Sequence, residues 1–262
     1  MNKNLLIRCD NRSNSGLGHL KRSLILANCS LKNGFNPFLL VDQKIDCFQE
    51  KINFPLLYSS NIHQNEQNEF QTIYEHMLQN FIDIVVIDSY LITKNIIKSL
   101  QEKNLLVIFF DDLKLNSTAD IVIDYSPNAN EKQYFNSKLA LLGPKYFITD
   151  SKVLINKNRN INSIIAHAGG SGLFENAPLL YKTIADFAKQ NDIDLTWLCP
   201  NQDIVNKLKK IVKTIKDDKI IGWVENTSAF WNKFDLVVGP PSTSLYEVLM
   251  QGSLPVSFPI SN

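Results

Sequence analysis

The chain has 262 residues, of which 44% are hydrophobic, which is enough for one large or two modest domains with buried cores. Its 27 Lys and Arg residues balance 26 Asp and Glu residues, and this argues against a protein held to nucleic acid or to a membrane surface by bulk charge. No apolar run approaches the length of a membrane span. The cysteines, Cys9, Cys29, Cys47 and Cys199, lack zinc-site spacing, and we interpret them as reduced thiols of a cytoplasmic protein.

Short β-rich runs alternate with helical patterns along the whole chain. The sequence predicts strands at 4–9, 37–41, 83–87, 105–110, 120–124, 163–167, 194–199, 219–221, 235–239 and 254–258. It predicts helices at 18–32, 66–80, 93–103, 176–190, 202–214, 227–233 and 243–251. Runs such as Ile84–Ile87 are apolar on both faces, which is typical of parallel strands covered by helices. The predicted class is therefore α/β, doubly wound.

A polar segment rich in Asn and Lys, from Thr149 to Asn160, predicts a linker between two domains, 1–150 and 151–262. After it the pattern of strand, glycine turn and helix begins again. Two such units in tandem favour a ligand cleft between domains. The last predicted strand lies close to residue 262, where a sheet normally needs a covering helix. We therefore expect the C-terminal domain to be incomplete.

The most informative motif follows the first predicted strand, in the run Asn14 to Ala27. Gly16 and Gly18 sit where that strand turns into the first helix, whose N-terminus offers free N–H groups to an anion. His19 stands in the first helical turn, and a side chain that titrates near neutrality beside an anion site is a candidate general base. A dinucleotide fingerprint needs a third glycine at the position of Lys21, and no P-loop is present. The alternative is a tight turn whose histidine only starts the helix.

Two further turns follow predicted strands in the second half. The first, with Gly169 and Gly170, indicates a nest of N–H groups for phosphate, or else a plain tight loop. In the second, Ser242 and Ser244 can cap a helix and bind phosphate oxygens. Glu247, one turn later, can hold the two hydroxyls of a ribose. The alternative is an ordinary N-cap with an acid that favours the helix dipole.

Acidic residues also end two strands of the first half. Asp88 and Tyr90 close one strand at its C-terminal end, where α/β sheets place ligand groups. Asp111 and Asp112 close the next, but adjacent residues point to opposite sides and no third carboxylate is fixed nearby. A metal site is therefore disfavoured.

Several of these motifs recur in the same order in one known family. They are Gly16–Arg22, Ile87–Tyr90, Phe110–Asp112, Gly169–Ser171 with Asn176, and Ser242–Glu247. In them the chain resembles the UDP-2,4-diacetamido-2,4,6-trideoxy-β-L-altropyranose hydrolases of pseudaminic acid biosynthesis. It is also similar to spore-coat polysaccharide proteins regarded as glycosyltransferases and, more distantly, to the N-acetylglucosaminyltransferase that makes lipid II.

The resemblance implies a GT-B fold, in which the C-terminal domain holds UDP and water attacks the anomeric carbon with inversion. It implies that His19 activates the water and that Tyr90 lies beside the reaction centre. It implies neither a metal nor a cofactor, and the expected partner is a UDP-sugar and not a nucleic acid. The predicted substrate- and nucleotide-binding residues are Gly16, Gly18, Arg22, Asp88, Gly169, Gly170, Ser171, Asn176, Ser242, Thr243, Ser244 and Glu247.

Three functions remain open from the sequence. The first is a nucleotide-sugar hydrolase in surface-polysaccharide biosynthesis. The second is a glycosyltransferase in which a sugar or lipid hydroxyl replaces water. The third is an inactive module that binds nucleotide sugars, although binding alone would not require His19. The sequence identifies neither the sugar nor the oligomeric state.

Overall fold

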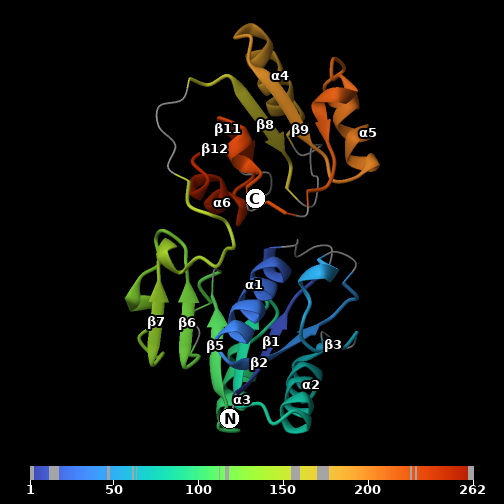
Figure 1. Cartoon of the computed structure of the whole chain (residues 1–262). Coiled ribbons are helices and arrows are strands. Elements are labelled where there is room, and N and C mark those ends of the chain that lie inside the picture. The colour runs from blue at the N-terminus through green and yellow to red at the C-terminus, as the bar shows by residue number, and fades with distance from the viewer. Residues whose placement is uncertain are drawn as a thin grey trace. The chain divides into compact units, whose positions relative to one another are not determined.

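The structure is a computed structural model (Figure 1). It describes residues 3–11, 18–45, 48–60, 62, 64–111, 113–115, 118–154, 160–169, 177–224, 226–227 and 229–258. The chain divides into two compact units, Met1–Thr149 and Asp150–Asn262. Each unit is built around its own parallel sheet.

The first unit has a seven-stranded parallel sheet in the order β3-β2-β1-β4-β5-β6-β7. Its strands are β1 (Lys3–Cys9), β2 (Phe35–Val41), β3 (Leu56–Tyr58), β4 (Ile84–Asp88), β5 (Leu106–Phe110), β6 (Ile121–Asp124) and β7 (Leu139–Leu142). Its helices are α1 (Gly18–Lys32), α2 (Glu66–Gln79) and α3 (Lys94–Gln101), with short 3-10 turns η1 (Gln49–Lys51), η2 (Glu131–Gln133) and η3 (Pro144–Tyr146).

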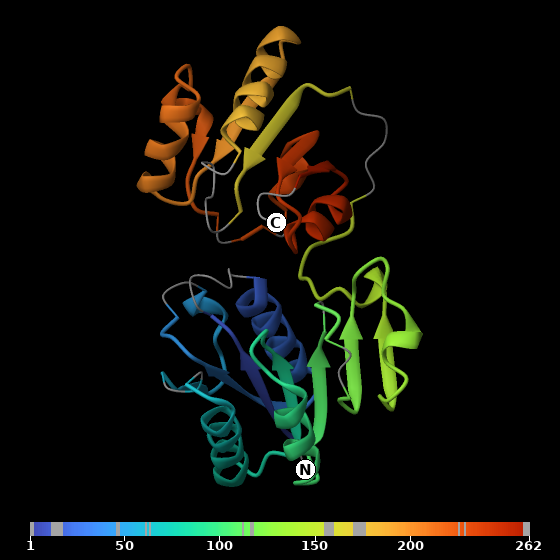
Figure 2. The same ribbon diagram turned by 180° about the vertical axis from the view of Figure 1, so that it is seen from behind.

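Helices cover both faces of this sheet (Figures 1 and 2). Side chains alternate along β1, so Leu6 packs with Ile73 of α2 and Ile97 of α3, whereas Leu5 and its alternate neighbours face the other way. On that second side lies α1, which buries Leu24. Burial on both sides explains why these strands are apolar throughout.

The second unit has a five-stranded parallel sheet in the order β10-β9-β8-β11-β12. Its strands are β8 (Ser163–His167), β9 (Asp194–Leu198), β10 (Ile220–Ile221), β11 (Leu236–Gly239) and β12 (Leu254–Ser257). Its helices are α4 (Pro178–Gln190), α5 (Gln202–Ile211) and α6 (Ser244–Met250), with 3-10 turns η5 (Asp217–Lys219) and η6 (Trp231–Lys233). One core cluster joins α4 and α5 to the sheet through Trp197, and a second joins η6 and α6 to it through Ile165.

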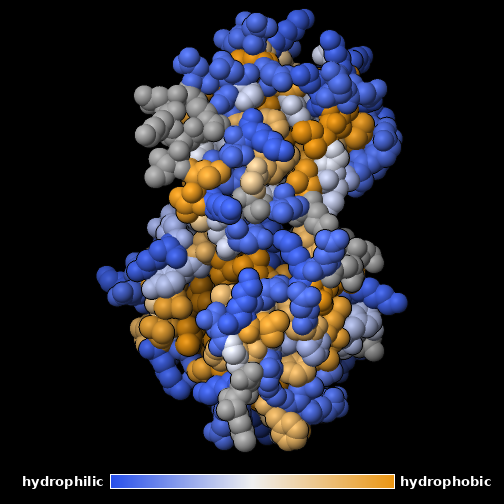
Figure 3. All heavy atoms as spheres, in the orientation of Figure 1, coloured by the Kyte–Doolittle hydropathy of each residue, from blue (hydrophilic) through white to orange (hydrophobic). Residues whose placement is uncertain are grey.

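The doubly wound parallel architecture expected from the sequence is confirmed, and each predicted strand has an observed counterpart within two residues at either end. The sequence analysis missed β3 and β7, which lie at the two edges of the first sheet. Their sequences are apolar, but the strands have only three and four residues, fewer than a typical strand, and Tyr58 and Leu139 are exposed at the sheet edges. Figure 3 shows apolar residues on the side of the first unit where β6 and β7 lie.

The helix predicted at 227–233 is wrong, because the described residues there form only the 3-10 turn η6. The side-chain amide of Gln251 replaces the expected helical bond between Trp231 N–H and Thr227 C=O. Gln251 Oε1 accepts from Trp231 N at 2.9 Å, and Gln251 Nε2 donates to Thr227 O at 2.7 Å. Gln251, the residue that follows α6, thus competes with helix formation in this segment.

The order of the strands creates one switch point in each sheet. The chain leaves β1 toward β2 on one side, while β4 pairs with the other side of β1. In the second unit β8 is flanked in the same way by β9 and β11. Ligands of open α/β sheets bind at the carboxyl ends of the strands at such a point, since the connections diverge there.

Candidate active site

The switch point of the first sheet brings together the start of α1 and the end of β4. Gly18 is the first residue of α1, and His19 is the second. Asp88 is the last residue of β4, 69 positions further along the chain. The Nδ1 atom of His19 is hydrogen-bonded to Oδ1 of Asp88, and both side chains are buried.

Asp88 is ionised, because its hydrogen-bond partners stabilise the carboxylate form. Both Nε and Nη2 of Arg22 donate to its carboxylate, and Ser23 Oγ donates at 3.4 Å. Burial by itself raises the pKa of Asp88, but the charge and hydrogen bonds of Arg22, together with His19, outweigh it and lower the pKa to about 2.

The contact with Asp88 selects a tautomer for the neutral form of His19. An ionised carboxylate only accepts hydrogen bonds, so in that form the contact with Asp88 places the proton on Nδ1. Arg22 Nη2 lies 3.2 Å from the same nitrogen. The lone pair is then on Nε2, to which none of the residues that the structure describes is hydrogen-bonded. A neutral imidazole held by a carboxylate in this way is the arrangement of a general base.

Tyr90 packs on the same imidazole. Its ring meets the His19 ring edge to face, with the centroids 4.3 Å apart, and the tyrosine is 41% exposed. Asp10, the residue after β1, fixes the backbone of Tyr90 by accepting from Tyr90 N at 3.1 Å and from Ser89 Oγ at 2.9 Å. Arg8 in turn donates to Asp10 at 3.0 Å. Tyr90 is therefore held against His19 by a buried ionic network.

Arg22 lies in the interior rather than at a surface. Its guanidinium binds Asp88, donates to Tyr125 Oη, and stacks over the ring of Phe110 with 4.8 Å from Cζ to the centroid. Arg22 and Asp88 are both nearly or fully buried, so the geometry favours a role for them in orienting His19. Direct contact of either residue with substrate stays a prediction.

In the second unit, the glycine turn after β8 contacts the turn after β11. Gly169 has φ +73°, a conformation that favours glycine, and its N–H donates to Nδ1 of His167 at 3.1 Å. A Cβ added to Gly169 would lie 3.3 Å from Pro240 Cγ, and one added to Gly239 would lie 2.3 Å from His167 Nε2. Burial lowers the pKa of His167 to about 4, which keeps the imidazole neutral.

The serine turn continues from this point into α6. The hydroxyls of Ser242 and Ser244 lie 2.6 Å apart and are hydrogen-bonded to each other. Thr243 precedes α6 but makes no side-chain cap bond, so the predicted capping by this turn is not observed. Ser242 is exposed, and its contact with phosphate stays a prediction.

Glu247 points into the second unit and is 5% exposed. Its Oε2 accepts from Thr227 Oγ1 at 2.8 Å and from Trp231 Nε1 at 3.4 Å. Both donors come from the segment before β11, which had been expected to form a helix. Glu247 is thus a structural anchor for that segment, and its predicted bond to ribose stays a prediction.

Four of the predicted binding residues, Gly16, Gly170, Ser171 and Asn176, lie outside the described residues. The same holds for Asp112. Among the residues that are described, no group of three or more His, Cys, Asp or Glu side chains could hold a metal ion. No helix in the described part of the chain is long and apolar enough to cross a membrane.

Sequence reasoning missed the residues that support the site from a distance. Tyr125 is 103 positions from Arg22, and Thr227 is 20 from Glu247. Asp10 had a weak signal, because it is an acid directly after a predicted strand. No sequence spacing identifies the other two, since only the fold brings them to their partners.

No protein-family model matches the chain, and no curated protein does. Solved structures with the GT-B fold do match. The S. aureus protein MnaA in complex with UDP is 13% identical, with a TM-score of 0.65 over 97% of this chain and 78% of that one. MurG of Acinetobacter baumannii is 12% identical, with a TM-score of 0.63 over 98% and 79%.

A UDP-GlcNAc 2-epimerase from Neisseria meningitidis, bound to UDP-GlcNAc, is also 12% identical, with a TM-score of 0.62 over 97% of this chain and 82% of the epimerase. These likenesses confirm the expected GT-B type of fold. At this level of identity they are likenesses of fold alone.

Proposed function

We propose that the protein is a nucleotide-sugar hydrolase that releases UDP from a UDP-sugar. The observation that carries the proposal is the His19–Asp88 pair at the switch point of the first sheet, because Nε2 of the imidazole in its neutral form is then available as a proton acceptor. The structural likeness to proteins solved with UDP and with UDP-GlcNAc supports the nucleotide. The motif resemblance to the diacetamido-trideoxyhexose hydrolases supports the reaction.

In this proposal His19 acts on water. Nε2 removes a proton as the water oxygen bonds to the anomeric carbon. The bond from that carbon to the phosphate oxygen breaks, and its electron pair leaves with UDP. The imidazolium that forms is stabilised by the Asp88 carboxylate, as in other histidine–carboxylate pairs. The proton then passes to solvent, which restores the neutral base.

The second unit takes the nucleotide in this proposal. Gly169, Ser242 and Ser244 lie at the carboxyl ends of β8 and β11, the switch point of the second sheet. Hydroxyl donors at that edge suit a diphosphate whose negative charge increases as the glycosidic bond breaks. Glu247 is the proposed partner of the ribose hydroxyls.

Hydrolysis in ¹⁸O-labelled water tests the proposed bond cleavage. The protein is incubated with a panel of UDP-sugars, including 2,4-diacetamido-trideoxy sugars, and no acceptor is added. The masses of the free sugar and of UDP are then determined by mass spectrometry. Attack at the anomeric carbon places ¹⁸O in the free sugar and leaves UDP unlabelled. Label in UDP would contradict it, because that label requires attack at phosphorus. UDP release that begins only when an alcohol acceptor is added would replace the hydrolase with a glycosyltransferase.

A further inference from the structure

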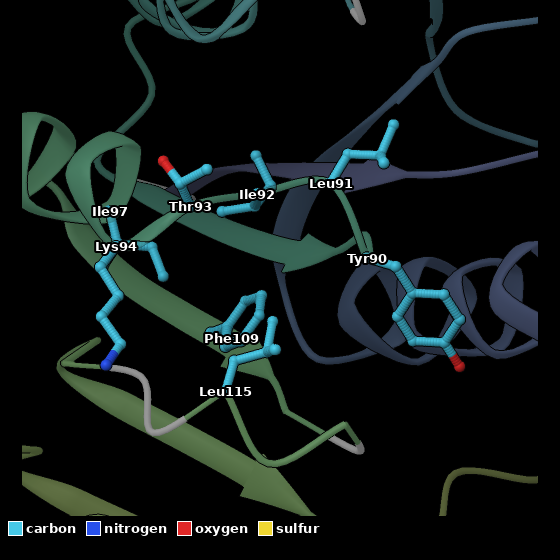
Figure 4. Close-up of a pocket in the computed structure, with 8 residues that line it drawn as sticks. All are labelled: Tyr90, Leu91, Ile92, Thr93, Lys94, Ile97, Phe109 and Leu115. Carbon is cyan, nitrogen blue, oxygen red and sulfur yellow. The ribbon is translucent and has the colours of Figure 1, made fainter.

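A cavity of about 320 Å³ lies beside Tyr90 in the first unit (Figure 4). Its buried lining includes Ile97 and Phe109, and its exposed lining includes Leu91 and Leu115. The loops that carry the two leucines follow β4 and β5, so the cavity lies at the carboxyl edge of the sheet, where α/β folds bind ligands. Its volume falls at the small end of the range for small-molecule sites.

Exposed apolar side chains concentrate around this cavity. Tyr90, Leu91 and Leu115 line it and are all exposed, and Leu113 is exposed in the same loop as Leu115. Single exposed leucines are ordinary, but several around one hollow are typical of a surface that contacts a ligand. The lining therefore favours an aliphatic group.

Among the described residues that line the cavity, Lys94 is the charged one. It is exposed and forms no ion pair with any residue in the described part of the chain, whereas Lys98 on the same helix pairs with Glu102 at 4.0 Å. Thr93 also lines the cavity, and its Oγ1 accepts from Ile96 N and caps α3. A cation at the edge of an apolar cavity suits a ligand with an anionic end.

We propose that this cavity binds a short aliphatic chain that carries an anionic group such as a carboxylate. The binding does not rest on the proposed hydrolysis. Tyr90 lines the cavity and also packs on His19, so a bound chain lies next to the candidate base. This aliphatic ligand is either a substituent of the nucleotide sugar or a separate molecule, and both sources share the same chemistry.

Titration of the methyl-labelled protein with hexanoate and octanoate, followed by NMR, tests the proposal. We expect saturable shifts of the methyl groups of Leu91, Ile97 and Leu115, with tighter binding for octanoate because it buries more apolar surface. Hexanol, a neutral probe of the same length, should bind more weakly than hexanoate. Shifts that do not saturate, or that spread evenly over the protein, would overturn the proposal.

Paired variants separate the charge from the apolar lining. Lys94→Gln should weaken hexanoate binding roughly two- to fivefold, as expected for an exposed charge pair, and leave hexanol unchanged. Its control is Lys98→Gln, which should change neither. Leu115→Asp should weaken both ligands by about tenfold or more, while Leu113→Asp, an exposed position outside the lining, should not. Equal effects of a variant and its control would overturn the assignment of the site.

Competition between octanoate and UDP-sugars identifies the source of the aliphatic ligand. UDP-sugars with and without acidic or acyl substituents are added to the octanoate complex. Displacement by a substituted UDP-sugar alone assigns the cavity to part of the nucleotide sugar. Retention of octanoate in the presence of bound UDP-sugar assigns it to a separate molecule. Because binding is read without turnover, a failure of this site is distinguishable from a failure of the hydrolase.

Discussion

Nδ1 of His19 and Oδ1 of Asp88 are hydrogen-bonded at the point where α1 and β4 meet, although 69 residues separate them in the chain. Arg22 binds both oxygens of that carboxylate, so the group that orients the imidazole is itself fixed. This relationship makes a histidine at a helix start a candidate base, because in the neutral imidazole a proton on Nδ1 leaves Nε2 as the acceptor.

Asp88→Asn should therefore abolish most of the activity while leaving nucleotide binding intact. The asparagine amide can turn its NH₂ group toward Nδ1 of His19, which moves the imidazole proton to Nε2. In other histidine–carboxylate pairs this change costs about 10⁴ in kcat. We expect a loss of UDP release of about that size, with the tautomer change visible in the ¹⁵N spectrum of His19.

The matched control for that variant is Asp120→Asn. Asp120 is also a carboxylate of the first unit, but it accepts from Val107 N and pairs with Lys138. It should keep its turnover. An Asp88→Asn protein that is as active as Asp120→Asn would show that the carboxylate does not set the state of His19.

Glu247→Ala should weaken UDP binding by roughly 10- to 100-fold, since hydrogen bonds to a charged group are worth about 1.5–3 kcal/mol. All three tryptophans belong to the second unit, so their fluorescence reports the titration. The control is Thr227→Val, which removes one structural bond to Glu247 and keeps the carboxylate. If both variants lose the same affinity, Glu247 acts only as an anchor for the Thr227 segment.

Gly239→Ala should destabilise the second unit. The new Cβ would lie 2.3 Å from Nε2 and 2.6 Å from Cδ2 of the buried His167 ring, which has little room to move. Overpacking of this kind costs about 1–3 kcal/mol. Urea unfolding followed by tryptophan fluorescence measures it. Gly222→Ala, where no atom lies within 4 Å of the added Cβ, should be nearly neutral, and equal midpoints for the two would refute the close approach.

The second unit should lose stability in mild acid because of His167. Its pKa in the folded state is about 4, below the value of about 6.5 in an unfolded chain, so the unfolded state takes up the proton first as the pH falls. The contribution of neutral His167 to the free energy of unfolding is complete above pH 6.5. It decreases as the pH falls to about 4, by up to about 3 kcal/mol. The free energy of unfolding measured with urea should fall with decreasing pH for wild type across this range. In His167→Gln it should depend less on pH. An unchanged slope in the variant would assign the effect elsewhere.

The fold was largely predictable because buried parallel strands carry their signal locally. Runs such as Ile84–Ile87 are apolar on both faces, so they indicate a buried strand without any knowledge of the neighbouring strands. The edge strands β3 and β7 are also apolar, but with three and four residues they are too short for that pattern to be distinctive. The segment before η6 misled the prediction because Gln251, a distant residue, takes the backbone groups that a helix would have used.

The part of the site that follows a turn between a strand and a helix could be predicted from the sequence. His19 and Tyr90 were expected beside one reaction centre, and their rings pack together. The orientation of His19 was not predictable, because it depends on a contact between the start of α1 and the end of β4. Asp88 and Arg22 were expected to meet substrate, yet their burial favours support of the histidine. Sequence spacing places a residue at a strand end but does not say which way its side chain faces.

The most direct measurement compares UDP release by wild type and by His19→Ala, without acceptor, beside their UDP affinities. The account predicts that wild type releases UDP from a UDP-sugar. It predicts that the variant is slower by roughly 10²–10⁴-fold, the usual contribution of a general base, and that both proteins bind UDP equally. An alanine variant that turns over at the wild-type rate would remove His19 from the reaction and contradict the central claim.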